Sequence, residues 1–279
     1  MARPARLEIA GAVYLIGARC PPEGGQPAFA DEADRAAMRA LLAQALHRFD
    51  AQALAYALMP AHYELLLFTR RANLSALMRH VNGVYTQHRQ RRHGFVGPLF
   101  QGRFHAVLVD RERHLLDACR HVDLNPVRLG LTARAADWAG SSFRALAALA
   151  PAPDWLDADG LHAHLLGRPA TTAAQHARAG ARYARQVDGE PAPDLVPVRE
   201  QIFLGDAAFA RRMRAAAVAP RRITRIGWAD WLRRADGIRA QALWRAHTEG
   251  GVAMTELAAQ LGLSVSRVSR LIAAAERAL

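Results

Sequence analysis

The sequence predicts an α+β fold for its N-terminal half. Between residues 7 and 125, short runs rich in β-branched and aromatic residues alternate with longer stretches of helical periodicity. A loop dense in Pro and Gly separates the first strand-like run from the first helix-like one. The segments follow one another in the order β-α-β-β-α-β-α. This is the order of a split βαβ, or ferredoxin-like, plan with one added helix.

The first strand is predicted at 7–19, where LEIAGAVYLIGAR contains stretches of period two. After the loop at 20–29, a helix is predicted at 31–49, with acidic residues in its first turn and apolar positions on one face. The other elements are predicted in chain order as strands at 53–60 and 62–70, a helix at 74–94 capped by Asn73 or Ser75, a strand at 103–110, and a helix at 111–125 that Pro126 ends.

The character of the chain changes beyond about residue 150. A Pro/Asp-rich junction and two linkers divide this part, a first linker at 187–198 and a basic connector at 220–227. Helices are predicted around 155–166, at 171–187 and, in two pieces with a Gly-Asp cap between them, at 199–217. The predicted domains are therefore 1–150, a helical extension at 151–217, and a C-terminal domain at 218–279.

Two short helices joined by a glycine are predicted within 255–279. Gly262 makes the turn, and Ser264 or Ser266 caps the second helix. The residues that would pack the pair are Leu257, Ala258, Leu261, Val268, Leu271 and Ile272. Such a pair is typical of a helix-turn-helix, with an ordinary helical hairpin as the alternative. In a helix-turn-helix, the residues facing the major groove of duplex DNA would be Ser264, Ser266, Arg267 and Arg270.

The net charge of +12 restricts the classes of partner. The chain contains no lysine, so all 37 basic residues are arginine. Such a chain favours a polyanionic partner, with nucleic acid first and an anionic membrane second. No stretch reaches the roughly 18 apolar residues of a membrane span, and no signal peptide is recognisable. Two distant cysteines, Cys20 and Cys119, do not form a disulfide framework or a zinc knuckle. We therefore expect a soluble, cytoplasmic protein without a membrane partner.

Two pairs of polar residues suggest a site in the N-terminal domain. His62 and Glu64 are two residues apart in a predicted strand, so their side chains face the same side. His121 and Asn125 are four residues apart on a predicted helix and share a face. An imidazole, a carboxylate and an amide can together bind a divalent ion. For a single buried histidine, a hydrogen-bonded core residue is the alternative.

Six stretches in fixed order resemble the REP-associated tyrosine transposases, within the HUH single-strand DNA transposase superfamily. They read MARPARLEIAGAVYLI, YALMPAHYELLL, LMRHVNGVYTQ, RRHGFVGPLFQGRF, LLDACRHVDLNPVRLGL and DWAGSSFRALA. The resemblance covers roughly residues 1–150 and continues more weakly to about 217. It implies a Mg²⁺ or Mn²⁺ ion held by two strand histidines and a polar residue of the later helix. It also implies that a tyrosine of this helix attacks a DNA phosphate, which the metal polarises.

This sequence departs from the family pattern at two of these four positions. His62 matches the first metal histidine and Asn125 the polar ligand, but Glu64 stands at the second histidine. A carboxylate binds Mg²⁺ and Mn²⁺ well, so this exchange is compatible with a metal site. His121 stands at the nucleophilic tyrosine. An imidazole can form a phosphoramidate, but it is shorter than a phenol and lacks its oxygen, so this exchange changes the chemistry more.

Two nearby tyrosines are poor substitutes for the missing nucleophile. Tyr63 alternates to the strand face opposite His62 and Glu64. Tyr85 lies on the helix predicted at 74–94, where the resemblance implies a tyrosine that is not the nucleophile.

The resemblance and the charge together predict a protein that binds structured single-stranded DNA, such as a hairpin, with impaired or lost nicking activity. The predicted DNA contacts are Arg89, Arg91, Arg92 and Arg103 in the N-terminal domain and Ser266, Arg267 and Arg270 in the C-terminal domain. A solvated helix end is the alternative for the basic run at 89–94. The resemblance also implies a homodimer.

Two other functions remain open at this level. One is an active metal-dependent nickase or transposase that uses His121, or a water molecule, as its nucleophile. The other is a regulator that binds duplex DNA through the C-terminal helices.

Overall fold

The chain forms two compact units, Met1–Val218 and Ala219–Leu279. The computed structural model describes residues 7–21, 26–189, 198–217, 227–248, 252 and 254–277, with the backbone alone at 273, 276 and 277. Each unit has its own hydrophobic core, and the two cores share no described residue. Most of the predicted linker at 187–198 and of the connector at 220–227 lies outside the described residues.

A six-stranded sheet in the order β2-β3-β1-β4-β6-β5 organises the first unit. β1 pairs antiparallel with both β3 and β4, and β2 pairs antiparallel with β3, whereas β6 joins β4 in parallel. The strands are β1 (Ala12–Arg19), β2 (Ala51–Met59), β3 (His62–Thr69), β4 (His105–Val109), β5 (Val198–Arg199) and β6 (Phe203–Leu204). The predicted α+β class is confirmed, because this sheet is combined with many helices.

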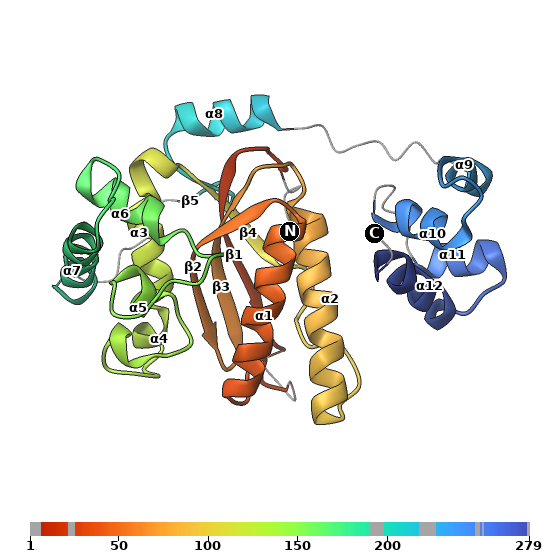
Figure 1. Ribbon diagram of the computed structural model, residues 1–279, viewed down its shortest axis with the longest axis horizontal. Helices are drawn as coiled ribbons and strands as arrows, with labels where there is room; N and C mark the ends of the chain where they lie inside the picture. The colour runs from red at the N-terminus through yellow and green to blue at the C-terminus, as the bar shows by residue number, and fades with distance from the viewer. Residues whose placement is uncertain are drawn as a thin grey trace. The chain divides into compact units, whose positions relative to one another are not determined.

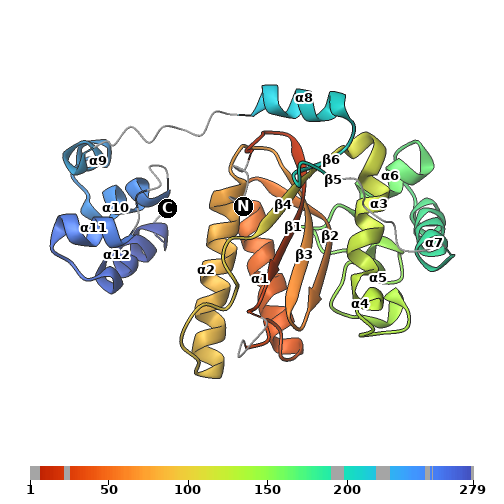
Figure 2. The same cartoon turned by 180° about the vertical axis from the view of Figure 1, so that it is seen from behind.

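Helices cover both faces of the sheet (Figure 1). One face carries the two long helices α1 (Glu32–Arg48) and α2 (Leu74–His93). Figure 2 shows, from behind, that the other face carries α3 and the helices that follow it, up to α7. These are α3 (Arg111–Asp123), α4 (Asn125–Arg128), the 3₁₀ turn η1 (Ala135–Asp137), α5 (Phe143–Leu146), α6 (Ala158–Leu166) and α7 (Ala173–Gly189). The expected helical extension therefore packs into the first unit, whose core includes its residues.

Local sequence signals explain where the main helices begin and end. The Asp31 carboxylate caps α1 by accepting a hydrogen bond from the backbone N–H of Asp34 at 3.0 Å. Gly94 ends α2 in the left-handed conformation, at φ 67°. α3 ends just before Pro126, which lies in the first turn of α4, where its missing N–H breaks no helical hydrogen bond.

Residues 199–217 differ from their prediction. The sequence indicated two helical pieces, but only α8 (Ala207–Ala216) is a helix, and Asp206 caps it by accepting from the N–H of Phe209 at 2.7 Å. The first piece instead forms the end of β5 and all of β6. Phe203 and Leu204 are buried there beside Leu108 and Val109 of β4. The edge of β4 with which this segment pairs lies far away in the sequence, so local periodicity contains no information about it. Tertiary pairing therefore overrides helix propensity here.

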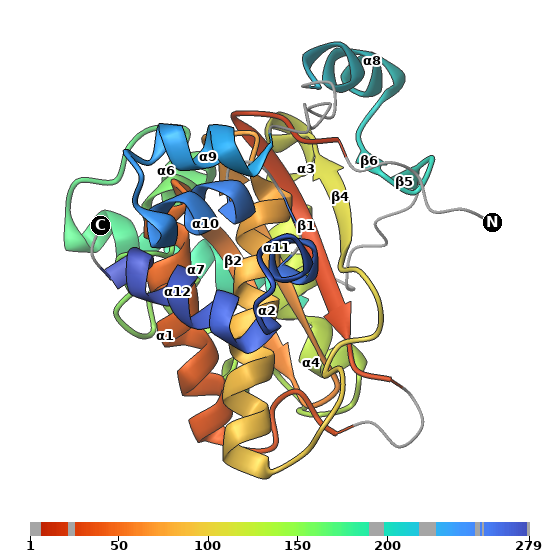
Figure 3. The same cartoon turned by 90° about the vertical axis from the view of Figure 1, so that its right-hand side faces the viewer.

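The elements that the structure describes in the second unit are helices, shown in shades of blue in Figure 3. They are α9 (Trp228–Arg234), α10 (Arg239–Thr248), α11 (Met254–Leu261) and α12 (Val265–Arg277). The predicted helix pair is confirmed as α11 and α12. Gly262 makes the turn between them at φ 62°, and Ser264, not Ser266, caps α12 by accepting from the N–H of Arg267 at 3.2 Å. Leu257, Ala258, Val268 and Ile272 are buried in the unit's core.

No helix among the described residues is long and apolar enough to cross a membrane.

Candidate functional site

The four predicted site residues meet where α3 and α4 cover β3. β3 runs between β1 and β2, and α3 packs against β2 and β3. His62 and Glu64 face this helix from alternate positions of the strand. His121 Nε2 lies 3.5 Å from Glu64 Oε2, and Asn125 Nδ2 lies 3.4 Å from His62 Nε2. The fold therefore brings together two residue pairs that are far apart in the sequence.

Burial and charge set the protonation of the two strand residues. Burial lowers the pKa of His62, even though the Glu64 carboxylate acts in the opposite direction. His62 is therefore neutral at physiological pH and offers a lone pair. Burial by itself would raise the pKa of Glu64, but the contact with His121, the charge of Arg128, and the charges that His121 and His62 carry when protonated outweigh it and lower that pKa. Glu64 is therefore an ionised carboxylate.

Arg128 is a site residue that the sequence prediction missed. Its guanidinium contacts His121 at both ring nitrogens, at 2.7 Å from Nδ1 and 3.2 Å from Nε2, and donates to the His121 carbonyl at 3.0 Å. Because arginine only donates, in the neutral ring we assign the lone pair to Nδ1, the nitrogen of the shorter contact, and the hydrogen to Nε2, toward Glu64. The spacing of seven residues across the Pro126 break is a weak helical signal that could have indicated this contact.

The His121 side chain is thus held on both sides. Arg128 occupies the lone pair of Nδ1, and the hydrogen on Nε2 points toward a carboxylate. The side chains of His121 and Glu64 are each 20% exposed, so solvent reaches them only partly. In this arrangement the ring has no free lone pair with which to attack a phosphorus atom.

None of the five tyrosines of the chain lies at this site with a free hydroxyl. All five are buried: Tyr14, Tyr56, Tyr63, Tyr85 and Tyr183. Tyr63 lies on the opposite face of β3, as predicted, and its hydroxyl donates to Asn82 of α2 at 2.5 Å. The Tyr85 hydroxyl donates to the Ala28 carbonyl at 2.7 Å. Burial raises the pKa of both phenols, which further disfavours a phenolate nucleophile.

The donor set at β3 fits a divalent ion in its chemistry. Glu64 Oε2 is buried without a hydrogen-bond partner, because its contact with His121 at 3.5 Å is too long for a good hydrogen bond. Asn125 can turn its amide oxygen toward His62 by a flip of the side chain. One neutral imidazole, one carboxylate and one amide oxygen suit Mn²⁺ or Mg²⁺.

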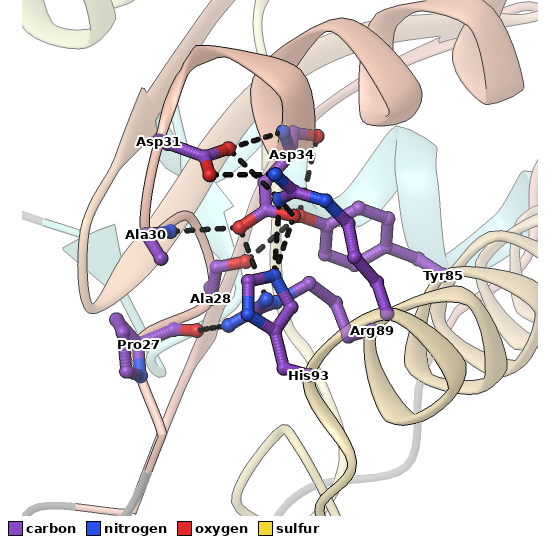
Figure 4. A network of polar contacts seen from close by, with 9 residues as sticks. Pro27, Ala28, Ala30, Asp31, Asp34, Tyr85, Arg89 and His93 are labelled. Atoms are coloured by element: carbon purple, nitrogen blue, oxygen red, sulfur yellow. Dashed lines mark hydrogen bonds and ion pairs between the residues drawn. The ribbon is translucent and has the colours of Figure 1, made fainter.

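The predicted DNA-binding arginines at the end of α2 have different environments. Figure 4 shows Arg89 beside Asp34 of α1, and its side chain is only 1% exposed. Its Nη1 lies 3.0 Å from Asp34 Oδ2, and its Nη2 donates to the Pro27 carbonyl at 2.6 Å. Arg92 pairs with both Asp31 and Asp34 while its side chain stays 34% exposed.

This network gives Arg89 a structural role. A buried guanidinium already paired with a carboxylate cannot reach a phosphate unless the end of α2 separates from α1. Arg91 is exposed, with its Nε donating to the Gln87 carbonyl at 3.2 Å, and Arg103 is exposed before β4. These two arginines are accessible to a polyanion.

In the second unit, Ser266, Arg267 and Arg270 are exposed on α12. They follow the Ser264 cap, so they lie in the first turns of the helix. Arg270 Nε donates to the Ser266 carbonyl at 3.4 Å. The predicted contacts thus share the N-terminal part of one helix.

Comparison with known proteins does not assign this chain to a family. No protein family and no curated protein matches this sequence. A solved structure, a REP-associated tyrosine transposase bound to a REP hairpin, aligns over 56% of this chain and 94% of its own, with 18% sequence identity and a TM-score of 0.46. At these values no activity is transferred from one protein to the other.

Proposed function

We propose that this protein binds structured single-stranded DNA, such as a hairpin, and that it derives from metal-dependent strand-transfer enzymes whose nicking activity it has lost or retains only in impaired form. The basic charge and the six sequence stretches support DNA as the partner. The antiparallel order β2-β3-β1-β4, with α1 and α2 on one face, supports a ferredoxin-like HUH domain. The first unit would bind the hairpin.

The loss of nicking is inferred from the residue at the nucleophile position and from its contacts. His121 stands at the tyrosine position of the resembled family, and its Nδ1 lone pair is occupied by Arg128. The five tyrosines are all buried and cannot replace it. Attack on a phosphate by His121 would require Arg128 to leave the ring first.

The remaining residues of the centre suit phosphate binding. His62, Glu64 and Asn125 would hold Mg²⁺ or Mn²⁺, which when bound polarises a phosphate oxygen. Arg128 is a cation beside these residues, and a guanidinium binds phosphate through two parallel hydrogen bonds. Arg91 and Arg103, which are exposed, would hold more distant backbone phosphates. We infer a binding site in which phosphate is held without being attacked.

A second candidate function is metal-dependent hydrolysis of single-stranded DNA. The contact between His121 and Glu64 favours it, because a carboxylate beside an imidazole is the arrangement of a general base. If DNA phosphate drew Arg128 away, the free Nδ1 of His121 would accept a proton from water. The attacking group would then be water, and no covalent adduct would form.

The second unit would add a contact with duplex DNA. Its pair α11–α12, joined at Gly262 and capped at Ser264, supports a helix-turn-helix with Ser266, Arg267 and Arg270 toward the groove. A hairpin with a duplex stem offers both kinds of surface to one chain. We also propose that the protein is a homodimer, as the resemblance implies; sedimentation as a monomer at micromolar concentration would contradict this.

The function is tested with a labelled single-stranded DNA hairpin, whose sequence is taken from the DNA beside the gene where that DNA contains a palindrome. The full-length protein is incubated with it in Mn²⁺, and the products are separated on native and denaturing gels. We expect a shifted band on the native gel and intact DNA on the denaturing gel. An unstructured strand of equal length and composition should be shifted less.

The other outcomes separate the candidates. A nick that needs Mn²⁺ and disappears in His121→Ala would establish the hydrolytic function, and a covalent adduct would refute the loss of the nucleophile. If no hairpin is shifted at low salt, DNA binding by the first unit is wrong. The paired change Glu64→His with His121→Tyr should restore cutting if the rest of the centre is intact.

A further inference from the structure

A second group of metal-ligating side chains lies between α6 and α7. It comprises Asp159 and His162 of α6 and His176 of α7, whose ligand atoms all lie within 4.8 Å of one another. His62, Glu64 and His121 do not form such a group among the described residues. The group extends from the core to the surface: His162 is 3% exposed, whereas the side chain of His176 is 30% and that of Asp159 is 85% exposed.

The backbone fixes the tautomer of the buried histidine. His162 Nε2 lies 2.9 Å from the Leu146 carbonyl, which only accepts hydrogen bonds, so this nitrogen carries the hydrogen. In the neutral ring the lone pair is then on Nδ1. A histidine that ligates a metal almost always donates its other N–H in this way to a carbonyl or carboxylate. His162 therefore has the orientation of a ligand with its supporting hydrogen bond already formed.

The lone-pair nitrogen of His162 faces His176, which in turn lies beside Asp159. Its Nδ1 lies 3.0 Å from Nδ1 of His176, and that atom lies 3.6 Å from Oδ1 of Asp159. Without a cation, His176 can donate one hydrogen to His162, and Asp159 then gains no hydrogen bond from that nitrogen. Two facing imidazole nitrogens and a nearby carboxylate oxygen can all be satisfied at once by a shared cation.

A glycine of α7 allows this helix to lie close to the segment around Ala147. A Cβ atom at Gly180 of α7 would lie 2.4 Å from the carbonyl oxygen of Ala147, so α7 approaches this segment more closely than any side chain would allow. His176 lies one turn before Gly180, and Leu146 comes just before Ala147. The same close approach therefore places His176 and the Leu146 carbonyl around His162.

A cavity opens at the three side chains. It has a volume of about 490 Å³, and its other walls are mostly alanine, leucine and proline side chains from the segment around 145–152. These walls contribute few polar side chains. A metal held by three protein ligands at the edge of such a cavity would keep a position for water or a small ligand.

We propose that Asp159, His162 and His176 bind a divalent transition-metal ion of the zinc class, with a position left open toward the cavity. Two imidazoles and one carboxylate are typical zinc ligands, whereas Mg²⁺ and Ca²⁺ prefer oxygen ligands alone. The site shares no residue with the centre at β3, so it stands independently of the proposed DNA function. A bound ion would also join α6 to α7.

The test uses the full-length protein stripped of metal and titrated with Zn²⁺, followed by calorimetry, and with Co²⁺, followed by visible absorption. We expect binding that His176→Ala and Asp159→Asn each weaken by about tenfold or more. His164→Ala is the matched control, because His164 is an exposed histidine of the same helix, and it should bind as the wild type does. His62→Ala should also retain the ion, which distinguishes this site from the centre at β3.

Several results would overturn the proposal. One is a wild-type protein that binds no Zn²⁺ at concentrations up to about 100 μM, which is well above the dissociation constants typical of protein zinc sites. Another is unchanged affinity and unchanged Co²⁺ absorption in His176→Ala, which would leave a plain hydrogen bond between two histidines. If His176→Ala fails to fold, Asp159→Asn decides, since this exposed residue is not part of the core.

Discussion

At the residue scale, the most perturbed carboxyl near the candidate site is Asp123, two residues after His121. It is fully buried, and it accepts hydrogen bonds from Ser142 Oγ and from the Tyr183 hydroxyl, each at 2.7 Å. Burial raises its pKa from 3.8 to about 7, although these hydrogen bonds act against the shift. Asp123 thus links α3 to α7 and to Ser142, the residue before α5. Because of its raised pKa, it is protonated over much of the acid range.

This pKa predicts a stability effect with a definite sign. A carboxyl whose pKa is higher in the folded state stabilises the fold below its ordinary pKa, and this contribution is lost as the pH rises through about 7. Asp123→Asn should therefore become more stable relative to the wild type between about pH 5 and about pH 8, by on the order of 1 kcal/mol or more. Urea unfolding at both pH values measures this difference. A difference that is constant with pH would contradict the shifted pKa.

Arg128 is the residue on which the proposed phosphate site depends most. Removing one arginine that contacts a phosphate lowers the number of counterions released on binding. Arg128→Ala should weaken hairpin binding and reduce the salt slope of log K by about 1. Gel-shift titrations at several salt concentrations measure this slope. Arg168→Ala, at an exposed arginine of the turn between α6 and α7, is the control, and an equal loss in both variants would indicate only a general effect of charge.

At the scale of elements, the packing of α1 against α2 depends on a buried ionic network. Asp34 is fully buried at the start of α1 and faces Arg89 and His93 of α2 (Figure 4). It also pairs with Arg92 of the same helix. It also accepts a hydrogen bond from the Ala30 N–H at 2.9 Å. One carboxylate therefore holds the start of one helix, the end of another and the loop between β1 and α1.

Removing this carboxylate should be costly, because Arg89 would remain buried without its partner. Asp34→Ala should lower the free energy of unfolding by about 3–5 kcal/mol. Glu32→Ala, which removes exposed pairs with Arg35 and Arg39 from the same turn, should cost about 1 kcal/mol or less. Chemical denaturation compares the two variants. Equal effects would mean that the buried pair adds nothing to the fold beyond a surface ion pair.

At the scale of the whole molecule, the chain carries two cores that share no described residue. The first core extends through the sheet and its helices on both faces, including residues of the extension such as Leu161 and Phe203. The second is made by α9 to α12 around residues such as Trp231 and Leu243. Separate cores of this kind unfold as separate cooperative units.

A cavity in one core should therefore leave the other unaffected. Leu243→Ala removes a fully buried side chain from α10 and should destabilise the second unit by about 2–5 kcal/mol. Hydrogen exchange followed by mass spectrometry should then show faster exchange in α10 to α12 and unchanged protection in β3. The reciprocal variant Leu66→Ala should do the opposite. Loss of protection in both units from either variant would show that they fold as one.

The sequence by itself determined the elements whose signals are local. The helix predicted at 31–49, the strand pair that begins near residue 53, the break before Pro126 and the glycine turn at Gly262 were all found at or within a few residues of their predicted positions. Each depends on periodicity, a cap or a backbone preference within a few residues. The side-by-side placement of His62 and Glu64 on one strand was also predictable, whereas the single helix expected at 111–125 was wrong, because α3 ends at Asp123 and Asn125 begins α4.

Only the tertiary structure decided what those side chains do. It placed Arg89 in the core beside Asp34, set Arg128 against His121, added Phe203 and Leu204 to the sheet, and brought His176 to His162. In most of these cases the partner lies on a different element, and no short-range pattern records which charges will face each other after folding. The physical reason is that burial and electrostatic partners are properties of the packed chain, whereas propensity is a property of neighbouring residues.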